Sequence, residues 1–231
     1  MSTILITGAN KGLGREAARR LLADGHTVWV GARDGARGEQ AAHELGAPFV
    51  QLDVTYQASV DAAAARIEAE HGALDVLVNN AGIAGERVAV PDTTVEQLRR
   101  VYETNVFGLV RVTQAFAPLL LRSPSPVVVN VSSGMGSLTV TTDPERLESS
   151  IVGLAYPSSK SALSMLTSQY AKAYPQMRIN AVDPGYTATD LNQNRGIQTV
   201  EEGAQAIVWA AGLGHDGPTG GFFDAKGAVP W

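Results

Sequence analysis

Short apolar runs rich in β-branched residues alternate with longer stretches of helical periodicity along most of this chain. The helical stretches carry apolar residues three or four positions apart, as in Val60, Ala64 and Ile67. The apolar runs predict strands at Thr3–Ile6, Thr27–Val30, Phe49–Leu52, Val76–Val78, Val127–Val131, Arg178–Val182 and Gly220–Phe223. Strands that alternate with helices predict an α/β fold, in which a doubly wound parallel sheet of about seven strands carries helices on both faces.

Length and composition indicate one domain over residues 1–231. Hydrophobic residues make up 45% of the chain and charged residues 18%, a balance typical of folded rather than disordered proteins. The longest stretch without clear periodicity is 134–155, which predicts a long loop between a strand and a helix. Loops of that length in a compact domain are usually functional or mobile.

Charge and residue content exclude several classes of protein. A net charge of −5 and a pI near 5.4 argue against nucleic acid or an anionic membrane as the main partner. The chain has no cysteine, and its four histidines are scattered, so we expect no disulfide and no metal site. The first strand leaves no room for a signal peptide, and no apolar run is long enough to span a bilayer. These features predict a cytoplasmic protein.

The segment Thr7–Gly14, TGANKGLG, follows the first strand directly and carries three glycines. Glycine permits a tight turn there, and its missing Cβ lets backbone N–H groups approach a pyrophosphate. The N-terminal end of the next helix would then face the anion with its positive dipole. A sharp connection without a ligand would need the same glycines, so this segment alone leaves both interpretations open.

Three further motifs decide between these interpretations. They are Asn79-Asn80-Ala81-Gly82 after the fourth strand, Tyr156-x-x-x-Lys160, and Asp183-Pro184-Gly185 after the sixth strand. With the glycine turn they resemble, in the same order and over essentially the whole chain, the short-chain dehydrogenase/reductase family, and in particular its carbonyl reductase-like subgroup. The resemblance implies a Rossmann-type fold, a nicotinamide cofactor and reduction of a ketone or aldehyde to an alcohol, or the reverse reaction.

The resemblance gives four residues a catalytic role. It implies that Tyr156 is the general acid, that Lys160 lowers the pKa of Tyr156 and holds the nicotinamide ribose, and that Ser133 orients the carbonyl. Asn105 would hold a water that connects Lys160 to solvent, from a locally irregular helix. Plainer roles are also possible for these residues. Tyr156 and Lys160 could be an ordinary helical pair at i and i+4, Ser133 could cap a loop, and Asn105 could be a core residue bonded to backbone.

Two details of these residues follow from their neighbours in the sequence. Pro157 disfavours helical geometry at Tyr156, so we expect Pro157 to be the first helical residue and Tyr156 to be the cap. Of the adjacent serines that end the fifth strand, the family pattern assigns the catalytic role to Ser133 and a structural one to Ser132.

The resemblance also outlines a cofactor site. Its residues are Gly8, Asn10, Lys11, Gly12, Leu13, Gly14, Arg33, Asp53, Val54, Asn80, Ala81, Gly82, Tyr156, Lys160, Pro184, Gly185, Thr187 and Thr189. Asp53 could instead cap the helix that follows it, and the two threonines could simply form a turn.

The charges near the end of the second strand indicate which cofactor is used. An acid there would recognise the ribose 2′-hydroxyl of NAD(H), whereas basic residues would recognise the 2′-phosphate of NADP(H). Arg33 and Lys11 are basic, and Arg37 could assist them. Asp34 is acidic but falls past the strand end, where it suits the cap of the next helix. The sequence therefore predicts a preference for NADP(H), with NAD(H) still usable.

Two features bear on the substrate and on rival functions. Ser133 and Tyr156 lie 23 positions apart, farther than is usual in the family, so 134–155 is interpreted as an insertion beside the substrate pocket. We expect a small-molecule carbonyl or alcohol substrate and either a monomer or a homo-oligomer. The main alternative is a regulatory protein that senses NADP(H) without catalysis. A nucleotide-sugar epimerase or dehydratase is less favoured, because few residues follow Gly185.

Overall fold

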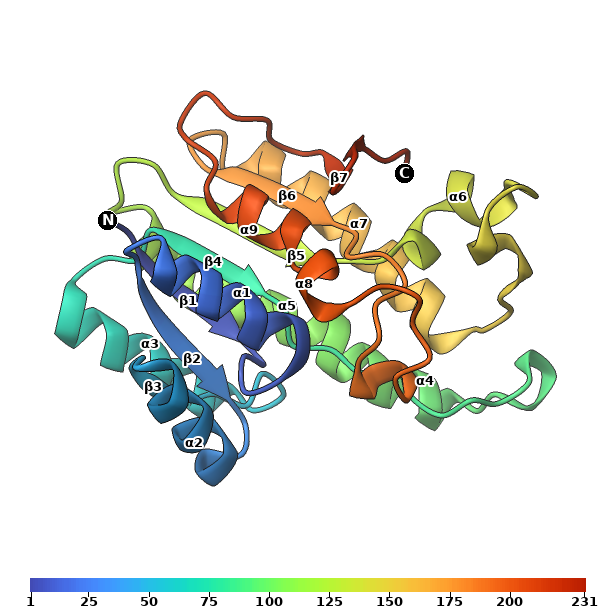
Figure 1. The fold of residues 1–231 in the computed structure, drawn as a ribbon, viewed down its shortest axis with the longest axis horizontal. Coiled ribbons are helices and arrows are strands. Elements are labelled where there is room, and N and C mark those ends of the chain that lie inside the picture. Colours follow the sequence, from blue (N-terminus) through green and yellow to red (C-terminus); the bar gives the residue numbers. More distant parts are fainter.

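The computed structural model describes residues 1–231 and contains one eight-stranded sheet with helices on both faces (Figure 1). The strands are β1 (Thr3–Thr7), β2 (Thr27–Ala32), β3 (Phe49–Gln51), β4 (Val76–Asn79), β5 (Val127–Val131), β6 (Arg178–Val182), β7 (Phe222–Asp224) and β8 (Gly227–Ala228). Their order in the sheet is β3-β2-β1-β4-β5-β6-β7-β8, and all neighbours are parallel except β7 and β8. The α/β fold with a doubly wound parallel sheet is thereby confirmed.

The helices form two layers. The α-helices are α1 (Gly12–Ala23), α2 (Gly35–Leu45), α3 (Gln57–His71), α4 (Val95–Tyr102), α5 (Gly108–Leu120), α6 (Leu138–Thr142), α7 (Ala155–Ala173), α8 (Val200–Gly203) and α9 (Gln205–Ala211). Helices α1, α2 and α9 bury their apolar side chains against one face of the sheet, and α3, α5 and α7 bury theirs against the other. No helix is long and apolar enough to cross a membrane.

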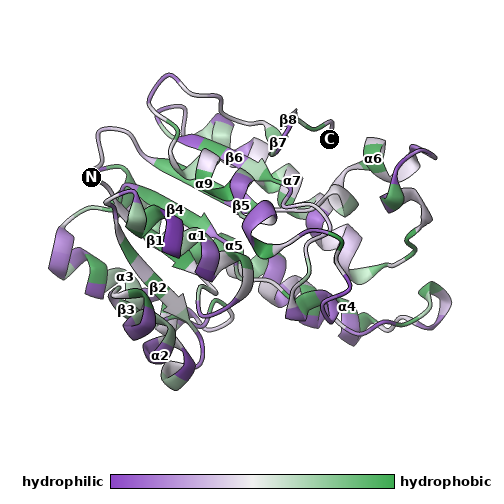
Figure 2. Ribbon diagram, in the orientation of Figure 1, coloured by the Kyte–Doolittle hydropathy of each residue, from purple (hydrophilic) through white to green (hydrophobic).

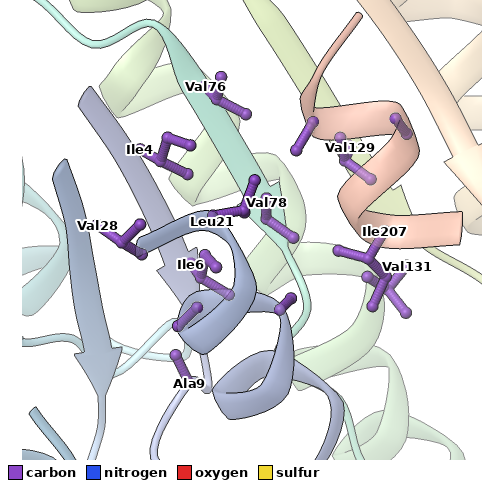
Figure 3. Packing of buried hydrophobic residues seen from close by; sticks show 14 of the residues in the cluster. Ile4, Ile6, Ala9, Leu21, Val28, Val76, Val78, Val129, Val131 and Ile207 are labelled. Atoms are coloured by element: carbon purple, nitrogen blue, oxygen red, sulfur yellow. The ribbon is translucent and has the colours of Figure 1, made fainter. Parts of the chain in front are cut away.

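The strands are apolar on both faces because both faces are covered. In β1, Ile4 and Ile6 point into the layer of α1 and α9, whereas Leu5 points into the opposite layer. Figure 3 shows the first of these layers, in which Ile207 of α9 packs beside Val131 of β5. This double burial explains why the sequence shows the central strands as uninterrupted apolar runs.

The structure corrects the expectation of an unbroken loop at 134–155. The segment contains a 3-10 turn at Gly134–Gly136, the short helix α6 and a second 3-10 turn at Leu147–Ser150. Ser137 caps α6 by accepting the backbone N–H of Val140 at 3.0 Å. Elements of three to five residues are too short to produce a helical period, so the pattern could not reveal them. In Figure 1 the segment stands away from the sheet.

Candidate active site

The predicted motifs meet at the carboxyl edge of the sheet. The chain places β2 and β3 on one side of β1, and β4, β5 and β6 on the other, so the strand order reverses between β1 and β4. In open α/β sheets the crevice at such a reversal is where ligands bind. The glycine turn follows β1, and the Asn80–Gly82, Ser133 and Pro184–Gly185 motifs follow β4, β5 and β6.

The glycine turn is shaped by its contacts with the chain after β4. Gly8 has a φ of +66°, and a Cβ there would lie 3.1 Å from Ala81 Cα; a Cβ on Gly14 would collide with Asn80 Nδ2. Asn80 Nδ2 donates to the carbonyl oxygens of Thr7 at 2.8 Å and Gly8 at 3.2 Å. Asn80 and Ala81, assigned to the cofactor from the sequence, therefore also lock the turn in place.

Helix α1 begins at this turn without any group to satisfy its positive end. Its N-cap residue, Lys11, forms no side-chain cap hydrogen bond, and its first turn carries no acidic residue. The first N–H groups of a helix have no partner within the helix, and with the dipole they attract an anion. The glycine turn and the start of α1 therefore fit the pyrophosphate of a dinucleotide, because glycine backbone without a Cβ lets the phosphates approach the N–H groups closely.

Three of the four candidate catalytic residues, Ser133, Tyr156 and Lys160, lie directly after β5 and along α7. Tyr156 is partly exposed, and its hydroxyl lies close enough to Ser133 for that serine to lower its pKa. Lys160 is 5% exposed, its Nζ donates to the carbonyl oxygen of Val131 at 2.7 Å, and it lies 5.6 Å from the centre of the Tyr156 ring. The adjacent Ser132 is buried, and its hydroxyl has no hydrogen-bond partner.

The geometry of Tyr156 differs from the sequence expectation in one respect. Helix α7 begins at Ala155 with Leu154 as its cap, so Tyr156 lies inside the first turn rather than at the cap. Pro157 is tolerated in the first turn because a backbone N–H there would have no helical partner in any case. Tyr156 and Lys160 consequently share one face of a regular helix.

Burial controls the ionisation of this pair. Burial raises the pKa of Tyr156 to about 12, although the hydrogen bond with Ser133 acts in the opposite direction. Burial also lowers the pKa of Lys160 to about 8, opposed by the negative charge of Asp183. Desolvation of the phenolate is the main cause of the raised pKa of Tyr156, and the lowering by Lys160 that the resemblance implies stays a prediction.

Asn105 lies in a π-helical turn, Glu103–Phe107, between α4 and α5, so the expected helix irregularity is present. Its Oδ1 accepts the N–H of Ile83 at 2.9 Å, and its Nδ2 donates to the carbonyl oxygen of Ile83 at 2.9 Å and to Ser159 Oγ at 3.0 Å. These bonds fix the loop after β4 against α7, directly beside Lys160. Ser159, which the sequence did not single out, completes this connection.

A small cavity lies beside Asn105 and is lined in part by Thr7, Asn79 and Gly108. Its volume of about 10 Å³ is near the size needed for one water molecule. Asn79 Oδ1 is buried without a hydrogen-bond partner, so the site offers an acceptor to such a water.

Asp183 is a buried carboxyl that sequence reasoning missed, because it was considered only as part of the Pro-Gly turn. It is 5% exposed and accepts the N–H of Gly185 at 2.9 Å. Burial raises its pKa, opposed by hydrogen bonds from the backbone of Gly185 and Gly134. Asp183 thereby connects the loops after β5 and β6. An acid immediately after a buried strand is the signal that could have indicated this role.

The other predicted cofactor residues do not all lie together. Thr189 packs near Gly12, since a Cβ on Gly12 would lie 3.7 Å from the methyl group of Thr189. Thr187 Oγ1 donates to the carbonyl oxygen of Pro184 at 2.9 Å, the turn-forming role considered for it. Asp53 accepts from Thr55, whereas Tyr56 takes the N-cap position of α3, so Asp53 is not its cap. Val54 packs against the position of Gly108.

A cavity of about 230 Å³ opens beside the glycine turn, and its wall holds three basic and two acidic side chains. Lys11, Arg15 and Arg37 line it, each near a carboxylate: Lys11 pairs with Asp190 at 2.8 Å, Arg15 with Glu44 at 2.6 Å and Arg37 with Asp34 at 3.6 Å. Arg33 is exposed and does not line this cavity. Arg15 was missed, although it lies four positions after Lys11.

Asp34 caps α2, as its position in the sequence suggested. Its Oδ1 accepts the backbone N–H of Arg37 at 3.1 Å, and its backbone takes the extended conformation of an N-cap residue. The carboxylate is therefore engaged at the helix start, and it pairs with Arg37 as well.

Comparisons with known proteins agree with this architecture. The sequence pattern of the short chain dehydrogenase family matches residues 2–199. A (+)-neomenthol dehydrogenase from Capsicum annuum is 34% identical, over 96% of this chain and 95% of the relative. Among solved structures, salutaridine reductase from Papaver somniferum superposes with a TM-score of 0.86 at 30% identity, over 96% of this chain and 99% of that one.

A second solved structure extends the likeness over the whole chain. The NADPH-bound carbonyl reductase from chicken fatty liver superposes with a TM-score of 0.88 at 28% identity, over 100% of this chain and 99% of that one. Family pattern, relatives and fold agree with the motifs at the sheet edge. The chain belongs to the short-chain dehydrogenase/reductase family, and it is an oxidoreductase of carbonyl or alcohol groups.

Proposed function

We propose that the protein is an NADPH-dependent carbonyl reductase that converts a ketone or aldehyde to an alcohol within one dinucleotide-binding and catalytic domain. The observation that carries this proposal is the partly exposed Tyr156, which lies close to Ser133 and is backed by the buried Lys160 at the same sheet edge as the glycine turn. A protein that only sensed the nucleotide would have no use for a proton donor at this place.

Tyr156 is the general acid in this proposal. With a pKa of about 12 its phenol keeps its proton throughout the neutral range, which is the state that carbonyl reduction requires. The substrate oxygen accepts hydrogen bonds from Tyr156 and Ser133, and the Tyr156 proton moves to this oxygen as negative charge develops there. The bound cofactor supplies the hydride that adds to the carbonyl carbon.

Lys160 and Asn105 support the proton donor. The Lys160 ammonium, when protonated, stabilises the phenolate that Tyr156 leaves behind after donating its proton. Its pKa of about 8 keeps most of the population charged at neutral pH. Asn105 fixes the loop after β4 through Ile83, and the small cavity beside it has room for a water that returns a proton toward Lys160.

The glycine turn, the start of α1 and the basic cavity are suited to NADPH. Gly8, Gly12 and Gly14 leave room for the pyrophosphate, and the N–H groups of α1 face it. Lys11, Arg15 and Arg37 line a cavity that can receive a 2′-phosphate, and Arg33 lies nearby in sequence, directly after β2. Asp34 is committed to capping α2, which favours NADPH over NADH. The NADPH-bound chicken enzyme supports the same cofactor.

A panel of ketones, aldehydes and quinones, offered with NADPH or NADH, tests this function by the loss of reduced-cofactor absorbance. We expect turnover of at least one carbonyl compound, with a higher kcat/KM for NADPH. Saturable NADPH binding without turnover of any panel member, or of alcohols in the reverse direction, would favour the sensor alternative. A higher kcat/KM for NADH would contradict the NADPH preference and indicate that Asp34 binds the ribose of NADH.

A further inference from the structure

Helix α6 of segment 134–155 is held by the C-terminal part of the chain. Ser137 Oγ donates to the carbonyl oxygen of Pro230 at 2.7 Å, and Thr139 Oγ1 donates to the main-chain oxygen of Trp231 at 2.7 Å. The backbone N–H of Thr139 reaches the same oxygen at 3.3 Å. Residues more than ninety positions apart are thus joined by three hydrogen bonds, beside each other in Figure 1.

These three hydrogen bonds are the long-range hydrogen bonds that connect α6 to the rest of the chain. Every other hydrogen bond of residues 138–142 joins them to residues between 137 and 143. Ser137 is fully buried and has two tasks, since it also caps α6 through the N–H of Val140. Three of the five side chains of α6, Leu138, Thr139 and Thr142, are exposed, so apolar packing holds the helix on one side only.

The tail that holds α6 is itself anchored in the sheet. Strands β7 and β8 form a hairpin whose turn is closed by Asp224, which accepts the N–H groups of Lys226 at 2.7 Å and Gly227 at 3.0 Å. The Trp231 ring stacks on Phe222 with centroids 5.3 Å apart and planes at 14°. Phe222 is 2% exposed and packs with Leu109 and Leu163. Because the tail packs on the core, it fixes where α6 lies relative to the core.

The other end of the segment reaches the candidate catalytic residues. Gly136 packs on the backbone of Lys160, where a Cβ would lie 2.8 Å from the Lys160 Cβ, and Ser161 Oγ donates to the Gly136 carbonyl oxygen at 2.9 Å. Residues 134–137 consequently connect Ser133 to α6 in a few positions. A displacement of α6 would move the edge of the pocket in front of Ser133 and Tyr156, while the glycine turn lies at other strands.

We propose that the tail Gly227–Trp231 holds α6 in place and thereby sets the shape of the substrate pocket, with Ser137, Thr139 and Trp231 as positioning residues for substrate selectivity. The part of this proposal that concerns the pocket rests on the carbonyl reductase function proposed above. The part that concerns α6 rests only on the contacts of the tail. None of the three residues takes part in the proton transfer.

Hydrogen–deuterium exchange of the full chain tests the attachment without any need for activity. The variants are Trp231→Ala and Thr139→Val, and the matched control is Thr142→Val, whose hydroxyl bonds only to Leu138 and Thr139 within α6. In Thr139→Val we expect exchange of the 138–143 amides to become about three- to tenfold faster, the ratio given by one lost hydrogen bond of ordinary strength. Trp231→Ala keeps the main-chain oxygen that Thr139 contacts but removes the ring that stacks on Phe222, so we expect faster exchange there because the tail is no longer anchored. Unchanged exchange in Thr139→Val would overturn the proposal even if Trp231→Ala fails to fold.

Kinetics then tests the consequence for selectivity. In Thr139→Val we expect the ratio of kcat/KM for a bulky and a small ketone to change about threefold or more, with the Kd for NADPH unchanged. Faster exchange with an unchanged ratio would overturn the role in selectivity. Faster exchange in a protein that turns over no carbonyl compound would contradict the proposed function while upholding the attachment of α6.

Discussion

The glycine turn and segment 134–155 follow parallel strands at the same edge of the sheet, but they are held in different ways. The turn is tied to the chain after β4 by hydrogen bonds from Asn80, across more than seventy positions of sequence. Residues 143–154, in contrast, form hydrogen bonds only with residues at most four positions away. One region is locked by the core, and the other is attached at its ends.

The surfaces of the glycine turn and of segment 134–155 also differ in polarity. Polar and charged side chains surround the glycine turn, whereas segment 134–155 exposes Leu138, Leu147, Ile151 and Val152. The ribbon around α6 carries green, hydrophobic stretches in Figure 2. Val152 is 82% exposed. The difference supports the proposal that cofactor binding and proton transfer depend on the sheet edge, while segment 134–155 supplies apolar contacts to the substrate.

The largest expected effect is at Tyr156. Tyr156→Phe removes the proton donor and keeps the ring, so we expect turnover to fall by about 100-fold or more. The Kd for NADPH should stay nearly unchanged, because the glycine turn is intact. Tyr170→Phe on the same helix is the matched control, since Tyr170 stacks on Tyr174 away from Ser133. Near-normal turnover of Tyr156→Phe would remove Tyr156 from the mechanism.

The next effect tests whether the basic residue directly after β2 recognises the 2′-phosphate, since Arg33 lies outside the cavity lined by Lys11, Arg15 and Arg37. Arg33→Asp should lower kcat/KM for NADPH by about 10- to 100-fold, the range expected for loss of a charge-assisted hydrogen bond, and should change NADH use little. Arg122→Asp serves as control, because Arg122 pairs with Glu68 far from the cofactor end of the strands. If Arg33→Asp affects both cofactors equally, Arg33 does not recognise the 2′-phosphate. The same change at Arg37 would then be the variant to measure.

The pH dependence of kcat/KM for NADPH reports groups of the free enzyme. Lys160 loses its proton as the pH rises through about 8, and the cation is the form that supports Tyr156 and the cofactor. We therefore expect kcat/KM to fall above pH 8, approaching tenfold per pH unit. Tyr156, with a pKa of about 12, stays protonated over this range. A flat profile up to pH 10 would contradict the assignment of Lys160.

The smallest effect concerns the apolar surface of segment 134–155. Val152→Ser together with Leu154→Ser should raise KM for bulky apolar ketones about three- to tenfold, in proportion to the apolar area lost. Small ketones and NADPH should bind as before. Met165→Ser, an exposed apolar position on α7 outside the segment, is the control. Weaker NADPH binding in the double variant would show that the two regions are not independent.

The sequence predicts the sheet well and the short or spatial features poorly. Strands such as Val127–Val131 are buried on both faces, so their apolar runs are plain in the sequence. The two residues of β8 and the five of α6 are too short to leave a period. Helix α7 begins two residues earlier than expected at Pro157, because the first helical turn does not need the proline N–H.

The candidate site likewise has features that the sequence predicts and features that it does not. Motifs place Ser133, Tyr156 and Lys160 correctly near one another, since each follows from a strand end or a helical spacing. Asp183 contacts Gly134 and Arg15 contacts Glu44 across distant segments, so the sequence could at most have indicated where Asp183 lies, at a strand end, and not these partners. Burial of Tyr156, which raises its pKa, cannot be judged from the spacing of a lysine.

The most direct test of carbonyl reduction at Tyr156 follows the transferred hydrogen. A ketone found in the panel is incubated with NADPH deuterated at its transferable position, and the alcohol is analysed by mass spectrometry. We predict one deuterium on the carbinol carbon, product equal to the NADPH consumed, and almost no product with Tyr156→Phe. Bound NADPH that yields no deuterated alcohol with any carbonyl compound would contradict the account.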